Sequence, residues 1–197
     1  MRLLLISILT LLTLGSIAHA EDKKNMSVNQ QVKLETTLGD IIIELDAEKA
    51  PASAKNFLDY VNSNFYDGSI FHRVISGFMA QGGGFDKDMK QKSSGSPIKN
   101  EADNGLKNVR GTLAMARTSD PDSASSQFFV NLKDNSFLDF KSKTSQGWGY
   151  AVFGRVIEGM EIVDKMAEQP TGSNGGHQDV PNTPIIMNKV TVMSAAQ

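Results

Sequence analysis

The sequence of 197 residues contains no cysteine and only three histidines. Without cysteine the chain cannot form disulfides, and it cannot carry a lipid on a cysteine that follows a signal segment. One histidine, His19, lies in the N-terminal segment, which leaves His72 and His177 for the rest of the chain. Two histidines do not complete a multi-histidine zinc site. No carboxylate-rich ligand spacing replaces them, so the sequence predicts no metal site.

Several catalytic signatures are also absent. No G-x-S-x-G nucleophile elbow occurs, and Gly82–Gly84 continues into Phe85–Lys87 without the residues of a P-loop or a dinucleotide fingerprint. Asp120 and Asp122 are conceivable glycosidase carboxylates, but such residues beside Pro121 more often form a turn. The sequence therefore predicts no cofactor and disfavours a hydrolase.

One long apolar run occurs, from Leu3 to Ile17, and it follows a single positive charge at Arg2. A membrane-spanning helix needs about 20 apolar residues, more than this run supplies. Ala18-His19-Ala20 has small residues at the two positions that a signal peptidase reads. We therefore expect residues 1–20 to be a cleaved export signal rather than a permanent anchor, with the periplasm favoured over secretion. Residues 21–31 are polar and aperiodic, which predicts a flexible leader.

Neither sign of charge dominates the remaining chain. Removal of Arg2 with the signal leaves 19 basic and 22 acidic residues, a net charge of −3 with both signs interspersed. This pattern predicts neither a nucleic-acid-binding face nor a polybasic membrane patch. Residues 32–197 are long enough for a single domain with a sizeable core. The absence of an additional interaction domain favours a monomer.

Short apolar segments with strand periodicity recur along the domain. The expected strands lie at 32–37, 41–45, in two halves of 71–84, and at 111–117, 127–131, 151–156 and 185–193. A helix is expected from Pro51, and a shorter one after Gly159. The stretches 86–107 and 171–176 carry turn residues and are expected to be surface loops. Many short strands without βα alternation predict a mainly antiparallel β domain, in the form of a closed barrel.

The stretch from Phe71 to Gly84 combines a cation, an amide, a thioether and two aromatic rings on two strands joined by a Ser-Gly turn. Met79 and Gln81 share one strand face, where a core strand would place two apolar residues. Arg73 alone is more typical of an exposed strand residue, whereas the unusual Gln81 favours a binding groove. His72 points away from Arg73 in an extended strand. We interpret it as a structural, hydrogen-bonded histidine rather than a catalytic base.

Five ordered segments spread across the domain carry a family resemblance: Phe71–Ile75, Gly77–Gly83, Gly111–Arg117, Ser126–Phe129 and Val152–Val156. With them, the chain from about Val32 to Met193 resembles the cyclophilin family of peptidyl-prolyl cis/trans isomerases, particularly its bacterial exported members. The resemblance implies an eight-stranded antiparallel barrel capped by two α-helices, in agreement with the strand pattern. It also implies a cofactor-independent isomerase that acts on X-Pro bonds in peptides and in folding exported proteins.

The resemblance assigns roles within the groove. It implies that Arg73 is the catalytic arginine and that Gln81 and Gln127 are polar groups lining the groove. Ala116 and Arg117 are implied as the strand edge whose backbone pairs with the substrate peptide. The implied apolar walls around the proline ring are Phe78, Met79, Phe129, Phe137, Leu138 and Tyr150.

Three of these positions depart from the pattern of many members. Arg117 stands in place of an asparagine, which keeps the backbone contact but changes the side chain over the substrate. Phe137 replaces a tryptophan that donates a hydrogen bond to cyclosporin, so binding of that drug is not implied. Tyr150 replaces a histidine and retains a ring that can pack on proline. An alternative function, a proline-peptide-binding module or holdase chaperone without significant catalysis, stays open.

Overall fold

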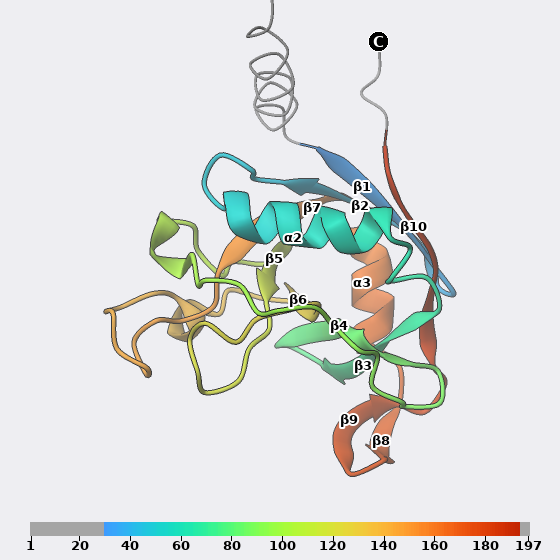
Figure 1. The fold of residues 1–197 in the computed structure, drawn as a ribbon. Coiled ribbons are helices and arrows are strands. Elements are labelled where there is room, and N and C mark those ends of the chain that lie inside the picture. Colours follow the sequence, from blue (N-terminus) through green and yellow to red (C-terminus); the bar gives the residue numbers. More distant parts are fainter. Residues whose placement is uncertain (1–29, 194–197) are drawn as a thin grey trace, which may run out of the picture.

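Eight strands close into one antiparallel barrel, which Figure 1 shows in colours that follow the chain. The computed structural model describes residues 30–193, so the predicted signal and nearly all of the predicted leader lie outside the described residues. Around the barrel the strands follow the order β1-β10-β3-β4-β6-β5-β7-β2. Their bounds are β1 Gln31–Thr36, β2 Gly39–Leu45, β3 Ser69–Ile75, β4 Met79–Asp86, β5 Thr112–Met115, β6 Phe128–Asn131, β7 Val152–Glu158 and β10 Ile185–Val192. The predicted fold class, an eight-stranded barrel with two helices, is confirmed.

The first hairpin shows how alternating residues fill the barrel. Val32 pairs with Ile43 and Leu34 pairs with Ile41 across β1 and β2, and all four side chains are buried. Lys33 lies between them in sequence and points to the other face, where it is partly exposed. Because successive side chains in a strand point to opposite faces, the sequence pattern alone sets which residues enter the core.

Two helices pack against the barrel. Helix α2, Pro51–Asn62, contacts β7 and β10, and helix α3, Met160–Ala167, contacts β2, β3 and β4. The two helices begin where the sequence predicts, since Pro51 is the first residue of α2 and Gly159 caps α3. Phe57 of α2 enters an aromatic cluster in which its ring centroid lies 5.1 to 5.4 Å from those of three other rings, Tyr66, Phe128 and Phe153.

The buried stripe of α2 differs in one respect from its apolar pattern. Ser53 is fully buried, whereas Leu58 is only partly buried. The hydroxyl of Ser53 donates a 2.7 Å hydrogen bond to Glu101, whose carboxylate also accepts the backbone N–H groups of Ala52 and Ser53. This carboxylate satisfies donors of the first helical turn that have no partner within the helix.

Strands β3 and β4 form the hairpin that the Ser76-Gly77 turn predicts, with Gly77 at a φ of 68°. The three glycines 82–84 lie within β4 rather than after it. Gly83 has a φ of 83°, and a Cβ there would lie 2.8 Å from the ring of Tyr66 and 3.0 Å from the carbonyl of Ser126. Glycine is required here because the backbone crosses directly over the aromatic cluster.

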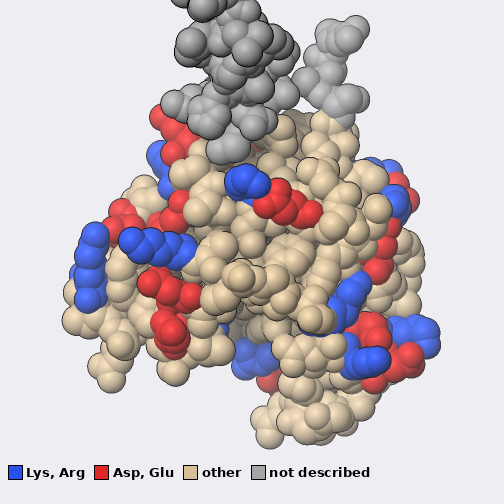
Figure 2. Space-filling view, in the orientation of Figure 1, with Lys and Arg blue, Asp and Glu red and all other residues tan. Residues whose placement is uncertain are grey.

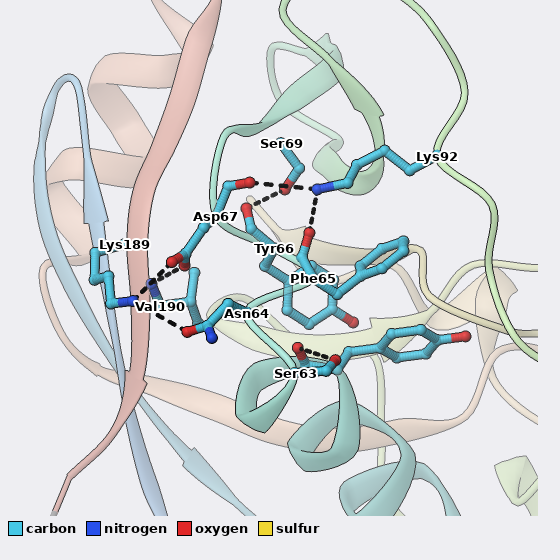
Figure 3. Close-up of polar contacts among 10 residues, drawn as sticks. Ser63, Asn64, Phe65, Tyr66, Asp67, Ser69, Lys92, Lys189 and Val190 are labelled. Atoms are coloured by element: carbon cyan, nitrogen blue, oxygen red, sulfur yellow. Dashed lines mark hydrogen bonds and ion pairs between the residues drawn. The ribbon is translucent and has the colours of Figure 1, made fainter.

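The stretch 86–107 runs over the surface and contains one short 3₁₀-helix, Ala102–Asn104. Lys92 ties its first part to the turn between α2 and β3, where its ammonium group donates to the carbonyls of Phe65 and Asp67 (Figure 3). The same turn is held from the other side by Lys189 of β10, which donates to the carboxylate of Asp67 at 2.8 Å and to Asn64 at 3.1 Å. The entry into β3 is therefore fixed from two sides.

The prediction of a surface loop at 171–176 is wrong for residues 171–174. Residues Thr171–Asn174 form β8, which pairs with β9, His177–Pro181, in a separate two-stranded hairpin below β3 in Figure 1. Gly175 and Gly176 turn the chain with φ values of 59° and 83°. Two consecutive positive φ values suit the tight turns that join antiparallel strands. The glycines therefore mark a hairpin turn rather than an irregular loop.

Acidic and basic side chains are interspersed on the face of the molecule seen in Figure 2. This agrees with the mixed charge pattern of the sequence. Within residues 30–193, no helix has the length and apolar character needed to cross a membrane.

Candidate active site

A pocket of about 140 Å³ brings together most of the residues that the sequence predicts for the site. Nine of the eleven line it, from β3, β4 and the turn between them, from β6 and the 3₁₀-helix Ser136–Leu138, and from the segments that follow β5 and precede β7. These nine are Arg73, Phe78, Met79, Gln81, Ala116, Arg117, Phe129, Leu138 and Tyr150. The other two, Gln127 and Phe137, contact pocket residues from outside it.

The floor of this pocket is an apolar cluster separate from the barrel core. Met79, Phe129 and Leu138 are at most 9% exposed and pack with Ala114 and Val152. The neighbours of these residues along β4, β5 and β6 belong to the main core instead, so the pocket lies on the outer face of the strands. Apolar surface on this face can bind a small apolar ring because it is not covered by packing in the barrel core.

Arg73 provides positive charge at the pocket. It pairs with Gln81 across β3 and β4, and its side chain is 42% exposed. Its Nε lies 3.6 Å from a carboxylate oxygen of Asp179 on β9. The guanidinium is therefore near an apolar floor and remains accessible from solvent.

Gln81 is held by the neighbouring strand. Its Nε2 donates a 2.9 Å hydrogen bond to the side chain of Gln127. Gly84 leaves the space for that partner, since a Cβ there would lie 2.5 Å from the Gln127 side chain. The carbonyl of Gln127 in turn accepts the N–H of Ala116 at 2.9 Å. Strand β5 ends at Met115, so the predicted edge residues Ala116 and Arg117 continue beyond its last residue.

Two aromatic contacts form the walls. Phe137 is 59% exposed and stacks on Phe78 with ring centroids 5.7 Å apart. On the other side, the guanidinium of Arg117 lies over the ring of Tyr150, 4.7 Å from its centroid. Arg117 also donates from Nε to the carbonyl of Gly149 at 2.8 Å. The residues that depart from the common pattern thus contribute apolar and stacked surface.

Residues 31–192 match the sequence model of the family described as cyclophilin type peptidyl-prolyl cis-trans isomerase/CLD. The chain belongs to the cyclophilin family. It is 57% identical over 162 residues to peptidyl-prolyl cis-trans isomerase cyp18 of Streptomyces antibioticus, covering 82% of this chain and 98% of the relative. It is 50% identical over 190 residues to peptidyl-prolyl cis-trans isomerase A of Dickeya dadantii, covering 96% and 97%.

A solved cyclophilin also shares the fold. The Cryptosporidium parvum enzyme, whose crystal structure was determined in the presence of the dipeptide Ala-Pro, is 32% identical and superimposes with a TM-score of 0.70. The match covers 84% of this chain and 99% of that one. The chain is accordingly a peptidyl-prolyl cis-trans isomerase of a family whose reaction needs no cofactor.

Three buried asparagines beneath this cyclophilin pocket were not predicted. Asn108, Asn131 and Asn135 are at most 1% exposed and are joined in series, since Asn131 donates to Asn108 at 3.2 Å and Asn135 donates to Asn131 at 2.8 Å. Asn135 also donates to the carbonyl of Phe78 at 2.9 Å. Asn108 donates to the carbonyl of Leu138 at 3.2 Å. The network thus fixes the backbone that carries the pocket walls.

One signal for this network was present in the sequence. Asn131 ends the segment Phe128-Phe129-Val130-Asn131, all of which is buried, and a buried amide must find hydrogen-bond partners. The partners Asn108 and Asn135 lie 23 and 4 residues away in the chain. Periodicity within a strand does not identify partners outside that strand.

His72 is part of the structure and does not line the pocket. It is 3% exposed, and its ring centroid lies 4.6 Å from that of Phe85. Burial first, and then the charges of His177 and Arg73, lower the pKa of His72 from 6.5 to about 4. Its Nδ1 has no hydrogen-bond partner among the described residues, and the hydrogen bond that His72 makes is with the backbone of Ile70, which partly opposes the lowering of its pKa. His72 is therefore neutral at pH 7.

A larger hollow of about 320 Å³ lies elsewhere, beside β2 and β7. Its lining includes Glu44 and Arg155, which form an ion pair at 3.0 Å. None of the eleven residues predicted for the site lines it. Its paired charges and the absence of a clustered aromatic wall make it a poorer match to an X-Pro peptide than the pocket beside Arg73.

Proposed function

We propose that this cyclophilin isomerises X-Pro bonds in exported proteins as they fold, and that Arg73 is its catalytic residue. The observation that carries the role of Arg73 is that one pocket brings it together with the apolar residues Met79, Phe129 and Leu138. An apolar floor suits the ring of proline, and a cationic donor beside it suits the adjoining peptide bond.

The chemistry requires no nucleophile. Rotation about a peptide bond is opposed by a barrier of roughly 18–20 kcal/mol because resonance between nitrogen and carbonyl must be broken. As the bond twists, the proline nitrogen becomes pyramidal and regains a lone pair that the planar ground state lacks. Arg73 can donate a hydrogen bond to that lone pair. Because the acceptor exists only in the twisted state, the interaction stabilises the transition state selectively.

One hydrogen bond does not account for the whole rate enhancement. A charge-assisted hydrogen bond contributes about 1.5–3 kcal/mol, whereas an acceleration of about 10⁵ requires close to 7 kcal/mol. We assign the remainder to immobilisation of the proline ring on Phe129 and its neighbours, and to contacts of Gln81 and the Ala116 backbone with the flanking peptide. These contacts hold one side of the bond while the other turns.

An Ala-Pro peptide provides the direct test. Its cis and trans forms give separate NMR signals, and exchange spectroscopy measures their interconversion without a coupled protease. Arg73→Ala should lower the catalysed exchange rate about 10- to 100-fold, as expected from loss of one charge-assisted hydrogen bond. Arg155→Ala is the matched control, because Arg155 is an exposed strand arginine in an ion pair outside the pocket. It should retain the parent rate.

The same measurement separates the alternatives. Peptide-induced shifts without accelerated exchange would favour the proline-peptide-binding module or holdase. Accelerated exchange that survives Arg73→Ala would leave the isomerase class intact and refute the role of Arg73.

Cyclosporin is expected to bind weakly, since Phe137 offers a ring without a hydrogen-bond donor.

We also propose that the protein acts in the periplasm after cleavage between Ala20 and Glu21. The proposal is supported by the charge, apolar run and small residues of the first segment. Mass spectrometry of protein from the periplasmic fraction should find a chain that begins at Glu21. Retention of Met1 in a membrane fraction would contradict it.

A monomer is proposed because the exposed large apolar residues in the described part of the chain are only three, Val109, Phe137 and Ile157. A stable subunit interface is usually more apolar than such scattered residues can provide. Light scattering on the purified protein should give the mass of one chain.

A further inference from the structure

The β8–β9 hairpin is docked on the barrel directly beside Arg73. Strand β9 lies against β3, which places the hairpin below β3 in Figure 1. The ring of His177 meets that of Phe85 edge to face, with centroids 4.9 Å apart. At the other end of β9, Val180 and Pro181 are buried. Strand β9 is thus packed or buried on both sides of Asp179.

Asp179 has an unusual backbone conformation between these two points. Its φ is 60°, in the left-handed region that few residues other than glycine adopt. Aspartate and asparagine tolerate this region better than most side chains, but it is still less stable than an ordinary strand conformation. Residues held in this way are found preferentially at functional sites. Here the conformation accompanies a carboxylate oxygen 3.6 Å from Nε of Arg73.

Arg73 needs an external constraint to act as a directed donor. Its side chain is 42% exposed, and a long exposed arginine can adopt many rotamers. Within residues 30–193, Asp179 is the one carboxylate that forms an ion pair with it. At 3.6 Å this is a charge contact and not a hydrogen bond. Its attraction favours rotamers of Arg73 that keep Nε toward Asp179, and these leave the outer nitrogens for another acceptor.

We propose that Asp179 is a positioning residue that orients the Arg73 guanidinium toward the twisting X-Pro bond. This inference rests on the proposed role of Arg73. Asp179 does not line the pocket, so it acts through Arg73 and not on the peptide. The β8–β9 hairpin therefore serves as a support for the catalytic donor.

The Asp179 carboxylate can act on Arg73 in two opposite ways, so the direction of the rate change on its removal distinguishes them. A carboxylate that only offsets positive charge would weaken the donor, and its removal would raise the rate. A carboxylate that orients the guanidinium lowers the cost of reaching the transition state, and its removal would lower the rate. The positioning role therefore predicts a loss.

Asp179→Asn removes the charge while keeping the shape and the tolerance of positive φ, and Asp179→Gly removes the side chain at a position whose φ suits glycine. Both should lower the maximal catalysed exchange rate of an Ala-Pro peptide about two- to fivefold, the range expected for an exposed ion pair. The dissociation constant of the peptide should stay unchanged, because the effect is confined to the transition state.

The matched control is Asp164→Asn. Asp164 pairs with Arg110 at 2.8 Å, and this pair has side-chain exposures of 45% and 44%, close to those of the Arg73–Asp179 pair. Asp164 lies on α3 and does not line the pocket. This variant should keep the parent rate, which separates loss of any exposed ion pair from loss of this one.

An NMR readout tests orientation directly. The Nε–Hε signal of Arg73, assigned by its disappearance in Arg73→Lys, should report a rigid side chain in the parent and increased mobility in both Asp179 variants. Unchanged mobility, or an unchanged or increased exchange rate in these variants, would overturn the positioning role. If Arg73→Ala is impaired while the Asp179 variants are not, the proposed function stands and only this inference fails. If Arg73→Ala is itself unimpaired, the role of Arg73 fails first.

Discussion

Acidification should destabilise this cyclophilin through His72, before the general protonation of carboxylates is complete. The ring is 3% exposed and packs against Phe85. Burial is the largest cause that lowers the pKa of His72 to about 4, followed by the charges of His177 and Arg73. A hydrogen bond with the backbone of Ile70 opposes the shift in part. The folded state therefore keeps His72 neutral well below pH 6.

The direction of the pH effect follows from the two pKa values. The unfolded chain binds this proton near pH 6.5, whereas the folded chain binds it only near pH 4. Between these values the unfolded state carries more protons, so the free energy of unfolding falls as the pH falls. The loss from His72 is about 2 kcal/mol at pH 5 and about 3 kcal/mol at pH 4, and it levels off below that.

Urea unfolding of the parent and of His72→Phe between pH 7 and pH 4.5 measures this loss. Phenylalanine keeps a ring against Phe85 and cannot bind a proton, so its own stability offset is the same at every pH. The free energy of unfolding of the variant, minus that of the parent, should be about 2 kcal/mol larger at pH 5 than at pH 7. This corresponds to a change of about 1 M in the difference between their urea midpoints. His177→Asn should retain most of the effect, since burial of His72 is its main cause.

Two results would contradict this role of His72 in the pH dependence of stability. Parallel pH dependence of the two proteins, or an NMR titration of the His72 ring near pH 6.5, would show that the folded protein accepts the proton without cost. The assigned burial of a neutral ring would then be wrong.

Two further predictions concern the frame of the site. Gly83→Ala should lower the free energy of unfolding by at least about 2 kcal/mol, because a left-handed backbone adds to the clash with Tyr66. Gly77→Ala, at a φ of 68° with open space around it, should cost only about 1 kcal/mol in the same urea measurement. Asn131→Ala should cost about 2–3 kcal/mol and weaken Ala-Pro peptide binding in an NMR titration, because Asn135 loses a buried acceptor. A stable variant with unchanged affinity would show that the asparagine network does not hold the pocket.

The barrel could be predicted because its information is local. Alternation along β1 and β2 decides which side chains are buried, and Ser76-Gly77 decides where β3 turns into β4. The order in which the strands close is another matter. The first strand pairs with the last, β10, and no local pattern connects segments so far apart. The family resemblance implied a closed eight-stranded barrel, whereas the order of its strands comes from the structure alone.

The hairpin β8–β9 was missed for a different reason. Its residues are mostly exposed, so they lack the alternation of apolar and polar side chains by which a half-buried strand is found. Gly175 and Gly176 do not decide the matter from sequence, because glycine permits both a loop and a tight turn. The pairing of Thr171 with Pro181 distinguishes the two.

Gln81 and Asn131 show what a polar residue at an otherwise apolar strand position can and cannot predict. Both are polar residues on the outer face of the strands that carry Met79 and Phe129. Gln81 lies at the pocket, whereas Asn131 is fully buried, covered by the segment that contains Asn135 and binds it. The same departure from apolar alternation therefore marks two roles, one toward a ligand and one toward the chain. Only the tertiary structure separates them, because the difference depends on which distant segment folds over each residue.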